Sequence, residues 1–161
     1  MAAFALRRIA DHVPTWLMKE LGNLWSPYLG AGIKVLEVSA NYRFLKVALK
    51  RRWYNLNYVG THFGGSIYAM VDPFYMLMLM QNLGKDYIVW DRAAVINFLK
   101  PGRSDLYAEF VIDEDLIEEI KAETALGEKY VFDLPVQVVD ENGTLIADIE
   151  KTIYVRRKKA N

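Results

Sequence analysis

The stretch NYVGTHFGGSIYAMVDPFYMLMLM, residues 57–80, decides the fold of this chain. It contains one acidic residue, Asp72, and no Lys or Arg. An ionisable side chain in so apolar a run must be satisfied locally or serve a function, because burying a bare carboxylate is costly. Residues 73–80 have the pattern of a helix without a polar face, which requires protein on every side. We therefore expect a sheet to curl around this helix.

The composition limits the classes of function. The 161 residues are enough for one domain with its own core. The 20 basic and 20 acidic residues give a net charge of zero, so no overall field attracts nucleic acid. The absence of Cys excludes disulfides and thiolate metal sites, and it is typical of the reducing cytoplasm. Because the sequence has only two histidines, we expect no metal centre.

A membrane-spanning segment is an alternative for residues 61–84, which carry one formal charge over a length that could cross a bilayer. Paired glycines, Asp72-Pro73 and two amide side chains interrupt this run, and a charge inside a membrane is costly. The N-terminus does not have the pattern of a signal peptide, because Asp11 and Pro14 follow its arginines. We therefore predict a cytoplasmic protein without membrane insertion.

Hydrophobic periodicity predicts the order of the elements. The predicted elements are an N-terminal helix and connector at 1–31, strands at 33–38 and 42–49, the apolar helix, strands at 87–99, 106–112, 129–139 and 144–155, a short helix after Asp113, and a basic tail at 156–161. Asn41 and Asn142-Gly143 mark hairpin turns. No linker interrupts the chain, so residues 1–161 form a single domain of the α+β class, with a curled antiparallel sheet wrapped around a central apolar helix.

The central stretch resembles a known motif. Asn57, then Gly64-Gly65, then Asp72 are similar to the motif of the hotdog-fold acyl-CoA thioesterases of the phenylacetate and four-hydroxybenzoyl type. In that family an Asn precedes His-Gly-Gly, and an acidic residue follows the second Gly by seven positions, as Asp72 follows Gly65 here. Residues 96–102, INFLKPG, resemble the next strand and turn. The resemblance covers about residues 30 to 155 and implies the hotdog fold.

Two short motifs, DPFYM at residues 72–76 and YIVWD at residues 87–91, look more like a subgroup of uncharacterised hotdog proteins. The second polar residue of the family's site falls at Trp90 or Asp91. Which of these two side chains faces the site stays open at this point.

The resemblance implies hydrolysis of an acyl-CoA thioester. Asp72 would act as the nucleophile or as the general base that activates water. The backbone N–H of Gly64, at a helix N-terminus, would stabilise the oxyanion, and Asn57 would orient the water or the acid. The family's site lies between two subunits, so the resemblance implies a homodimer, or a dimer of dimers, in which Asp72 of one chain faces Gly64 of the other. Coenzyme A enters as part of the substrate, and no cofactor is needed.

Residues around Gly64 complete the expected site. The residues that we expect to contact the substrate are Thr61, His62, Phe63, Gly65 and Arg103, the last through coenzyme A phosphates. Phe63 stands where the family commonly has His, and His62 lies one place earlier, which disfavours the His-dependent dehydratase chemistry of related hotdog enzymes.

Simpler interpretations of the same residues stay open. Asp72 before Pro73 has the pattern of a helix N-cap. Gly64-Gly65 would allow a helix to pack closely on the sheet, and Asn57 would stabilise its own loop. The alternative function is a non-catalytic hotdog protein that binds an acyl chain or an acyl thioester, which Phe63 in place of His favours.

Overall fold

The structure is a computed structural model that describes residues 15–158. It begins with two helices, α2 (Thr15–Asn23) and α3 (Ser26–Ala31). The sequence predicted a connector where α3 lies, but a proline in the first turn favours a second short helix there. The part of the N-terminal prediction that concerns residues 1–14 lies outside the described residues.

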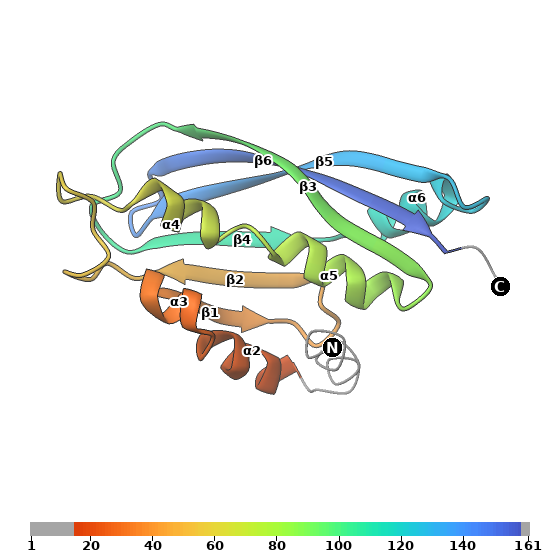
Figure 1. Cartoon of the computed structure of the whole chain (residues 1–161), viewed down its shortest axis with the longest axis horizontal. Helices are drawn as coiled ribbons and strands as arrows, with labels where there is room; N and C mark the ends of the chain where they lie inside the picture. Colours follow the sequence, from red (N-terminus) through yellow and green to blue (C-terminus); the bar gives the residue numbers. More distant parts are fainter. Residues whose placement is uncertain (1–14, 159–161) are drawn as a thin grey trace.

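A six-stranded antiparallel sheet forms the body of the molecule (Figure 1). Its strands are β1 (Ile33–Val38), β2 (Phe44–Leu49), β3 (Tyr87–Phe98), β4 (Leu106–Val111), β5 (Lys129–Asp140) and β6 (Leu145–Arg157). The order across the sheet is β1-β2-β4-β5-β6-β3, which leaves β1 and β3 at the edges. The predicted strands agree closely with these, except that β6 includes Arg156 and Arg157. Both pair with β3, so they do not belong to a tail.

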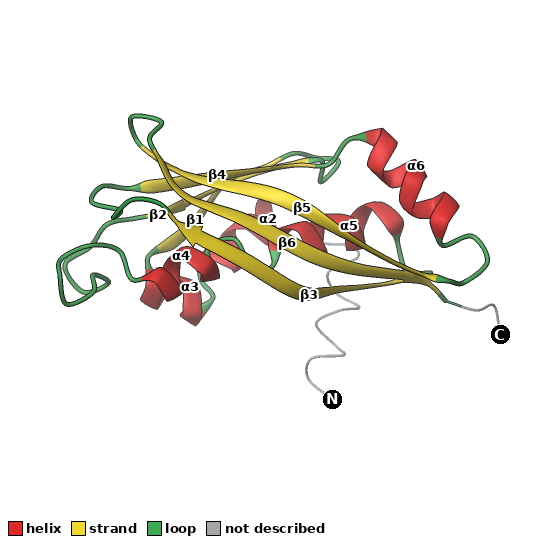
Figure 2. Ribbon diagram, turned by 90° about the horizontal axis from the view of Figure 1, so that it is seen from above, coloured by secondary structure: helices red, strands yellow, loops and turns green. Residues whose placement is uncertain are grey.

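The apolar stretch forms two helices rather than one. They are α4 (Gly64–Ala69) and α5 (Phe74–Leu83), and both lie against the same side of the curled sheet (Figures 1 and 2). The apolar pattern predicted only the second helix, whereas the resemblance implied a helix that begins at Gly64, as α4 does. Asp72 lies in the connection between them, the N-cap position of α5 is Pro73, and no side chain caps this helix. The interpretation of Asp72 as an N-cap is therefore wrong.

The core lies between α5 and the sheet. The rings of Phe74 and Tyr75 pack on Phe110 of β4, with centroids 5.2 and 5.0 Å apart. The Tyr75 hydroxyl donates to the Pro135 carbonyl of β5 at 2.7 Å. Leu77, on the opposite side of α5, remains exposed in the single chain. The sheet therefore covers the helix on one side and does not enclose it.

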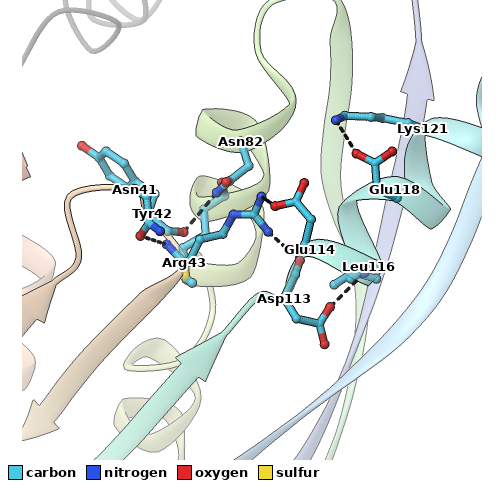
Figure 3. Close-up of polar contacts among 10 residues, drawn as sticks. Asn41, Tyr42, Arg43, Asn82, Asp113, Glu114, Leu116, Glu118 and Lys121 are labelled. Carbon is cyan, nitrogen blue, oxygen red and sulfur yellow. Dashed lines mark hydrogen bonds and ion pairs between the residues drawn. The ribbon is translucent and has the colours of Figure 1, made fainter.

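Polar contacts fix the far end of α5 (Figure 3). Asn82 donates to the carbonyl of Tyr42 in the β1–β2 turn at 3.1 Å. The neighbouring Arg43 donates to Glu114 at 2.7 Å, in the first turn of α6 (Glu114–Glu123). Asp113 caps α6 as predicted, accepting from the Leu116 N–H at 2.8 Å. The hairpin, α5 and α6 are thereby joined at the end of the molecule opposite α4.

Candidate active site

Asp72 meets a buried lysine that the sequence analysis missed. The Nζ of Lys151 lies 3.1 Å from Asp72 Oδ1 and 3.2 Å from Asp91 Oδ1. It also lies 5.1 Å from the ring centre of Tyr68, within range of a cation–π contact. The Lys151 side chain has no exposed surface. A lysine is almost never fully buried unless it is paired, and here carboxylates from two other elements supply the partners.

The strand pattern explains how these side chains meet. Lys151 alternates in phase with Ile149 and Ile153, whose side chains enter the core. In β3 the pairing with β6 shifts between Asp91 and Ala93, which marks a bulge. Bulges redirect side chains and are frequent beside functional sites.

The choice between Trp90 and Asp91 is settled by their orientation. The side chain of Asp91 is 17% exposed and is directed at Lys151, whereas Trp90 is 66% exposed. Asp91 is therefore the polar residue that joins Asp72.

The cluster has one cation and two carboxylates in a partly dry environment. Burial raises the pKa of Asp91, and the charge of Lys151 partly offsets this rise. Burial alone would lower the pKa of Lys151, but the charges of Asp91 and Asp72 outweigh it, so the pKa of Lys151 is raised. Burial also raises the pKa of Tyr68, and a hydrogen bond with Asp72 adds to the effect. Lys151 therefore stays protonated at neutral pH.

Asp72 is the exposed member of the cluster, with 47% of its side chain accessible. Its Oδ1 accepts from Lys151 at 3.1 Å, and the hydroxyl of Tyr68 is the other neighbour of its carboxylate. Asp91 forms an ion pair with Lys151 rather than a directed hydrogen bond. Asp72 is thus held at Oδ1 while its carboxylate stays accessible, so that it can accept a proton or attack an electrophile.

A cavity of about 310 Å³ lies at the other end of α4. Its lining residues are Asn57, Thr61, His62, Gly64, Ile67, Phe98, Leu99, Lys100, Pro101 and Gly102. The structure therefore brings together four of the residues predicted for the site, Asn57, Thr61, His62 and Gly64, around one space.

The remaining predicted residues lie outside this lining. Phe63 and Arg103 are exposed, and Gly65, Phe63 and Arg103 do not border the cavity. A larger cavity of about 700 Å³ between β4 and β5 contains none of the predicted residues. It lies where the pairing of these strands is limited to three residue pairs.

Asn57 organises the loop that enters α4. Its Nδ2 donates to Thr61 Oγ1 at 2.8 Å and to the His62 carbonyl at 3.2 Å. Its Oδ1 accepts from the N–H groups of Val59 and Thr61, each at 3.1 Å. Asn57 thus stabilises its own loop, which was one of the two interpretations of this residue.

His62 is buried beside this loop. Its Nε2 lies 2.8 Å from the Ser104 carbonyl, an acceptor that selects the tautomer with a proton on Nε2. Nδ1 is then an acceptor, and it has no partner within the described part of the chain. Burial lowers the pKa of His62, and the nearby charge of Arg51 acts in the same direction. His62 is therefore neutral at neutral pH.

The two glycines of the motif fit tightly at the start of α4. A Cβ on Gly64 would lie 3.1 Å from Cζ of Phe98, and a Cβ on Gly65 would overlap the ring of Phe63. Gly64 therefore permits close packing of α4 on β3. The N–H groups of both glycines have no acceptor in residues 15–158, as expected in a first helical turn.

The two parts of the predicted site are separate within one chain. Asp72 follows Gly64 by eight positions, and at the rise of a helix this corresponds to about 12 Å. Among the described residues, no group of three or more His, Asp or Glu is arranged to hold a metal ion. No helix in the described range is long and apolar enough to cross a membrane.

Solved structures with the same architecture establish the class of fold. The chain is similar to a Pseudomonas aeruginosa protein, PA5026, of unknown function and described as "Probable Thioesterase", with a TM-score of 0.79, 17% identity and coverage of 90% of this chain and 97% of that one. It is also similar to thioesterase HI1161 of Haemophilus influenzae, with a TM-score of 0.65, 16% identity and coverage of 89% and 91%. The curled antiparallel sheet packed on helices is the hotdog fold.

The sequence also matches a family model over residues 15–155. The chain belongs to this family, which is described as a domain of unknown function, DUF4442. Among curated protein sequences, none matches this chain.

Proposed function

We propose that the protein is a thioesterase that hydrolyses an acyl-CoA, with Asp72 as the group that carries the chemistry. The observation that supports this most directly is the state of Asp72, which is half exposed, with Oδ1 anchored on the buried Lys151. The structurally similar proteins named thioesterases support the class of reaction.

Asp72 would act in one of two ways. As a general base it takes a proton from water, whose oxygen attacks the thioester carbonyl. As a nucleophile its carboxylate attacks that carbonyl, and water then hydrolyses the resulting anhydride. In both routes the C–S bond breaks and the thiolate of coenzyme A leaves and takes up a proton. The Gly64 N–H would stabilise the negative charge that develops on the carbonyl oxygen.

A homodimer would bring the two groups together. Within one chain Gly64 begins α4 and Asp72 lies in the connection that follows this helix, about 12 Å away at the helical rise. The outer edge of β3 has no strand beside it in the described part of the chain, and Trp90 and Val95 on this strand are exposed. Leu77 of α5 is also exposed. These apolar surfaces support a dimer, or a dimer of dimers, in which Asp72 faces the partner's Gly64.

The cavity at Gly64 would receive the thioester end of the substrate, with Asn57, Thr61 and His62 in its wall. Phe63 and Gly65 adjoin it in sequence, and Arg103 would meet coenzyme A phosphates from the surface. No cofactor is required in this scheme, because coenzyme A is part of the substrate. The absence of Cys supports a cytoplasmic location.

A non-catalytic protein that binds an acyl chain or acyl thioester is the second candidate. Phe63 occupies the place of the family's His, and its side chain is exposed. This protein would bind the same ligands without releasing thiol.

Thiol release from a panel of acyl-CoAs tests the proposal. Wild type should hydrolyse at least one member, and Asp72→Asn should lose about 10²-fold or more of that rate, the contribution typical of a general base. Asp115→Asn, on the exposed face of α6, is the matched control and should keep the wild-type rate. Binding without thiol release would favour the second candidate, and release that persists in Asp72→Asn would remove Asp72 from the mechanism.

Mixed dimers test the subunit arrangement. Gly64→Pro removes the N–H at the first helical position, where Pro is tolerated. Phe63, with ψ of 128°, already has the backbone conformation that a following Pro requires. Co-expressed Asp72→Asn and Gly64→Pro chains should regain activity, because one site per mixed dimer keeps both groups. Failure of this mixture to exceed either variant alone would contradict a shared site.

A further inference from the structure

We propose that Lys151 is the positioning residue for Asp72, and that Asp91 holds Lys151 in place for this task. This inference rests on the proposed function, which assigns Asp72 but gives no role to the buried lysine. Nothing in the hydrolysis scheme requires Lys151 to touch the substrate, and its side chain has no exposed surface.

A structural role alone does not explain a lysine at this position. Lys151 occupies a core position between Ile149 and Ile153 on the inner face of β6. Replacing buried ion pairs by apolar residues of similar volume is often neutral or stabilising, because desolvating the charges offsets their attraction. Apolar residues in place of both Lys151 and Asp91 would therefore serve the core at least as well, so a buried ion pair beside Asp72 points to a task at that residue.

The backbone around Asp72 leaves its carboxylate free to turn. Asp72 lies between α4 and α5, and its N–H donates to the Tyr68 carbonyl at 3.0 Å. Its side chain is half exposed, and the Lys151 ammonium donates to its Oδ1 at 3.1 Å. A reactive group must be held within about 0.5 Å of its working position by neighbours that are themselves fixed. Lys151 meets this requirement because it is fully enclosed.

The neighbours of Lys151 restrict the position of its ammonium group. Asp91 lies on one side at 3.2 Å, Asp72 on another at 3.1 Å, and the Tyr68 ring faces the ammonium at 5.1 Å. Tyr28 is another buried titratable residue near this cluster. Burial raises the pKa of Tyr28, and the charge of Asp72 raises it further. With Asp91 removed, Lys151 would keep Asp72 but lose the counter-charge that fixes its other side.

Kinetics of Lys151→Met test the proposal. Met keeps an apolar stem and removes the charge. With the acyl-CoA that wild type hydrolyses best, we expect kcat to fall about 10- to 100-fold, the usual effect of losing a group that orients a site, and KM to stay close to wild type. Asp91→Asn keeps the Lys151–Asp72 pair, so its kcat should fall less than that of Lys151→Met. Lys46→Met, which breaks an exposed ion pair with Glu109 on β2 and β4, is the matched control and should keep full activity.

Chemical rescue separates positioning from packing. Lys151→Ala leaves space for a small cation, so added n-propylammonium should restore part of kcat, while n-butanol, which fills space without charge, should not. Equal rescue by both, unchanged kcat in Lys151→Met, or a loss confined to KM would each overturn the proposal. Far-UV circular dichroism shows whether Lys151→Met folds. If it does not, the double variant Lys151→Met/Asp91→Asn is used instead, because it also removes the Asp91 carboxylate that would be buried without a partner.

A crystallographic measurement keeps this test independent of the proposed function. If wild type hydrolyses no acyl-CoA, the thioesterase proposal fails, but the orientation of Asp72 can still be compared in wild type and Lys151→Met. We expect the carboxylate to leave its wild-type rotamer, or to occupy several, in the variant. The same single rotamer in both proteins would overturn the positioning role.

Discussion

Lys151 on β6 and Asp91 on β3 form an ion pair between neighbouring strands, with 3.2 Å between Nζ and Oδ1. Both side chains point to the inner face of the sheet, where every neighbour in phase with them is apolar. The pair is completed by Asp72 from the connection between the two central helices. Lys151, the fully buried charge among residues 15–158, therefore lies beside the proposed reactive group.

Asp91 should make stability depend on pH in an unusual direction. Its pKa is raised by burial above the ordinary 3.8, so the folded state binds this proton more tightly than the unfolded state. Its contribution is greatest at low pH and is lost as pH rises through the raised pKa. We expect the free energy of unfolding of Asp91→Asn, relative to wild type, to improve between about pH 4 and about pH 7. Urea titrations at both pH values check this. A stability of Asp91→Asn that falls relative to wild type as pH rises would contradict it.

His62 should make the protein less stable as pH falls, the opposite of the effect of Asp91. Burial lowers its pKa below 6.5, so its contribution to stability is present above 6.5 and is lost as pH falls through the lowered folded value. His62→Gln keeps a donor for the Ser104 carbonyl and does not titrate. The stability advantage of wild type over His62→Gln should therefore shrink between about pH 7.5 and about pH 5 in urea titrations. An advantage that grows on acidification would show that the folded protein protonates His62 readily.

Gly64 and Phe98 should be energetically coupled. A Cβ on Gly64 meets Phe98 Cζ at 3.1 Å, so the ring, which is 55% exposed, must shift. Gly64→Ala should cost more stability in wild type than in Phe98→Leu, where the shorter side chain makes room. A double-mutant cycle should give a coupling of about 0.5 kcal/mol or more. Additive effects would indicate that the ring moves aside without cost.

Asp113 should stabilise α6 by about 1 kcal/mol, the usual value of an N-cap side chain. Its carboxylate accepts from the Leu116 N–H at 2.8 Å. Asp115→Ala is the control, because Asp115 lies in the same first turn without capping it. Chemical denaturation should show a larger loss for Asp113→Ala than for Asp115→Ala. Equal losses would mean that charge near the helix dipole, rather than the cap, accounts for the effect.

The fold was largely predictable because its patterns are local. Asn142-Gly143 marked the β5–β6 hairpin, and Gly143 does adopt a positive φ of 78°. Asp113 marked the start of α6, and alternation marked the six strands. The residue pattern did not indicate α4, because its six residues begin with two glycines and have little helical preference of their own, and only the resemblance placed a helix start at Gly64. Packing of Gly64 on Phe98 stabilises it instead.

The site was less predictable because its contacts are distant in sequence. The motif predicted Asn57, Gly64 and Asp72, and two of these lie at one cavity. Lys151 was missed because Glu150-Lys151-Thr152 looks like an ordinary polar segment of a strand. Its phase with Ile149 and Ile153 placed it in the core, but the partner that makes such burial tolerable is 79 residues away. The bulge in β3 has no comparable local pattern.

The bulge in β3 adds one residue, Arg92, and this residue affects which side chains of the strand face the core. Asp91 pairs with Ile153 and Ala93 with Thr152, so Arg92 is the additional residue that joins two segments of β3 with different alternation. Deleting Arg92 would restore one uninterrupted alternation in which Asp91, Ala93 and Ala94 keep their partners on β6, so both segments of the strand would keep their faces. If Arg92 stayed and the bulge were replaced by regular pairing, Arg92 would take the inner position beside Ala94, Asp91 would turn to the outer face, and Lys151 would lose one of its two anions.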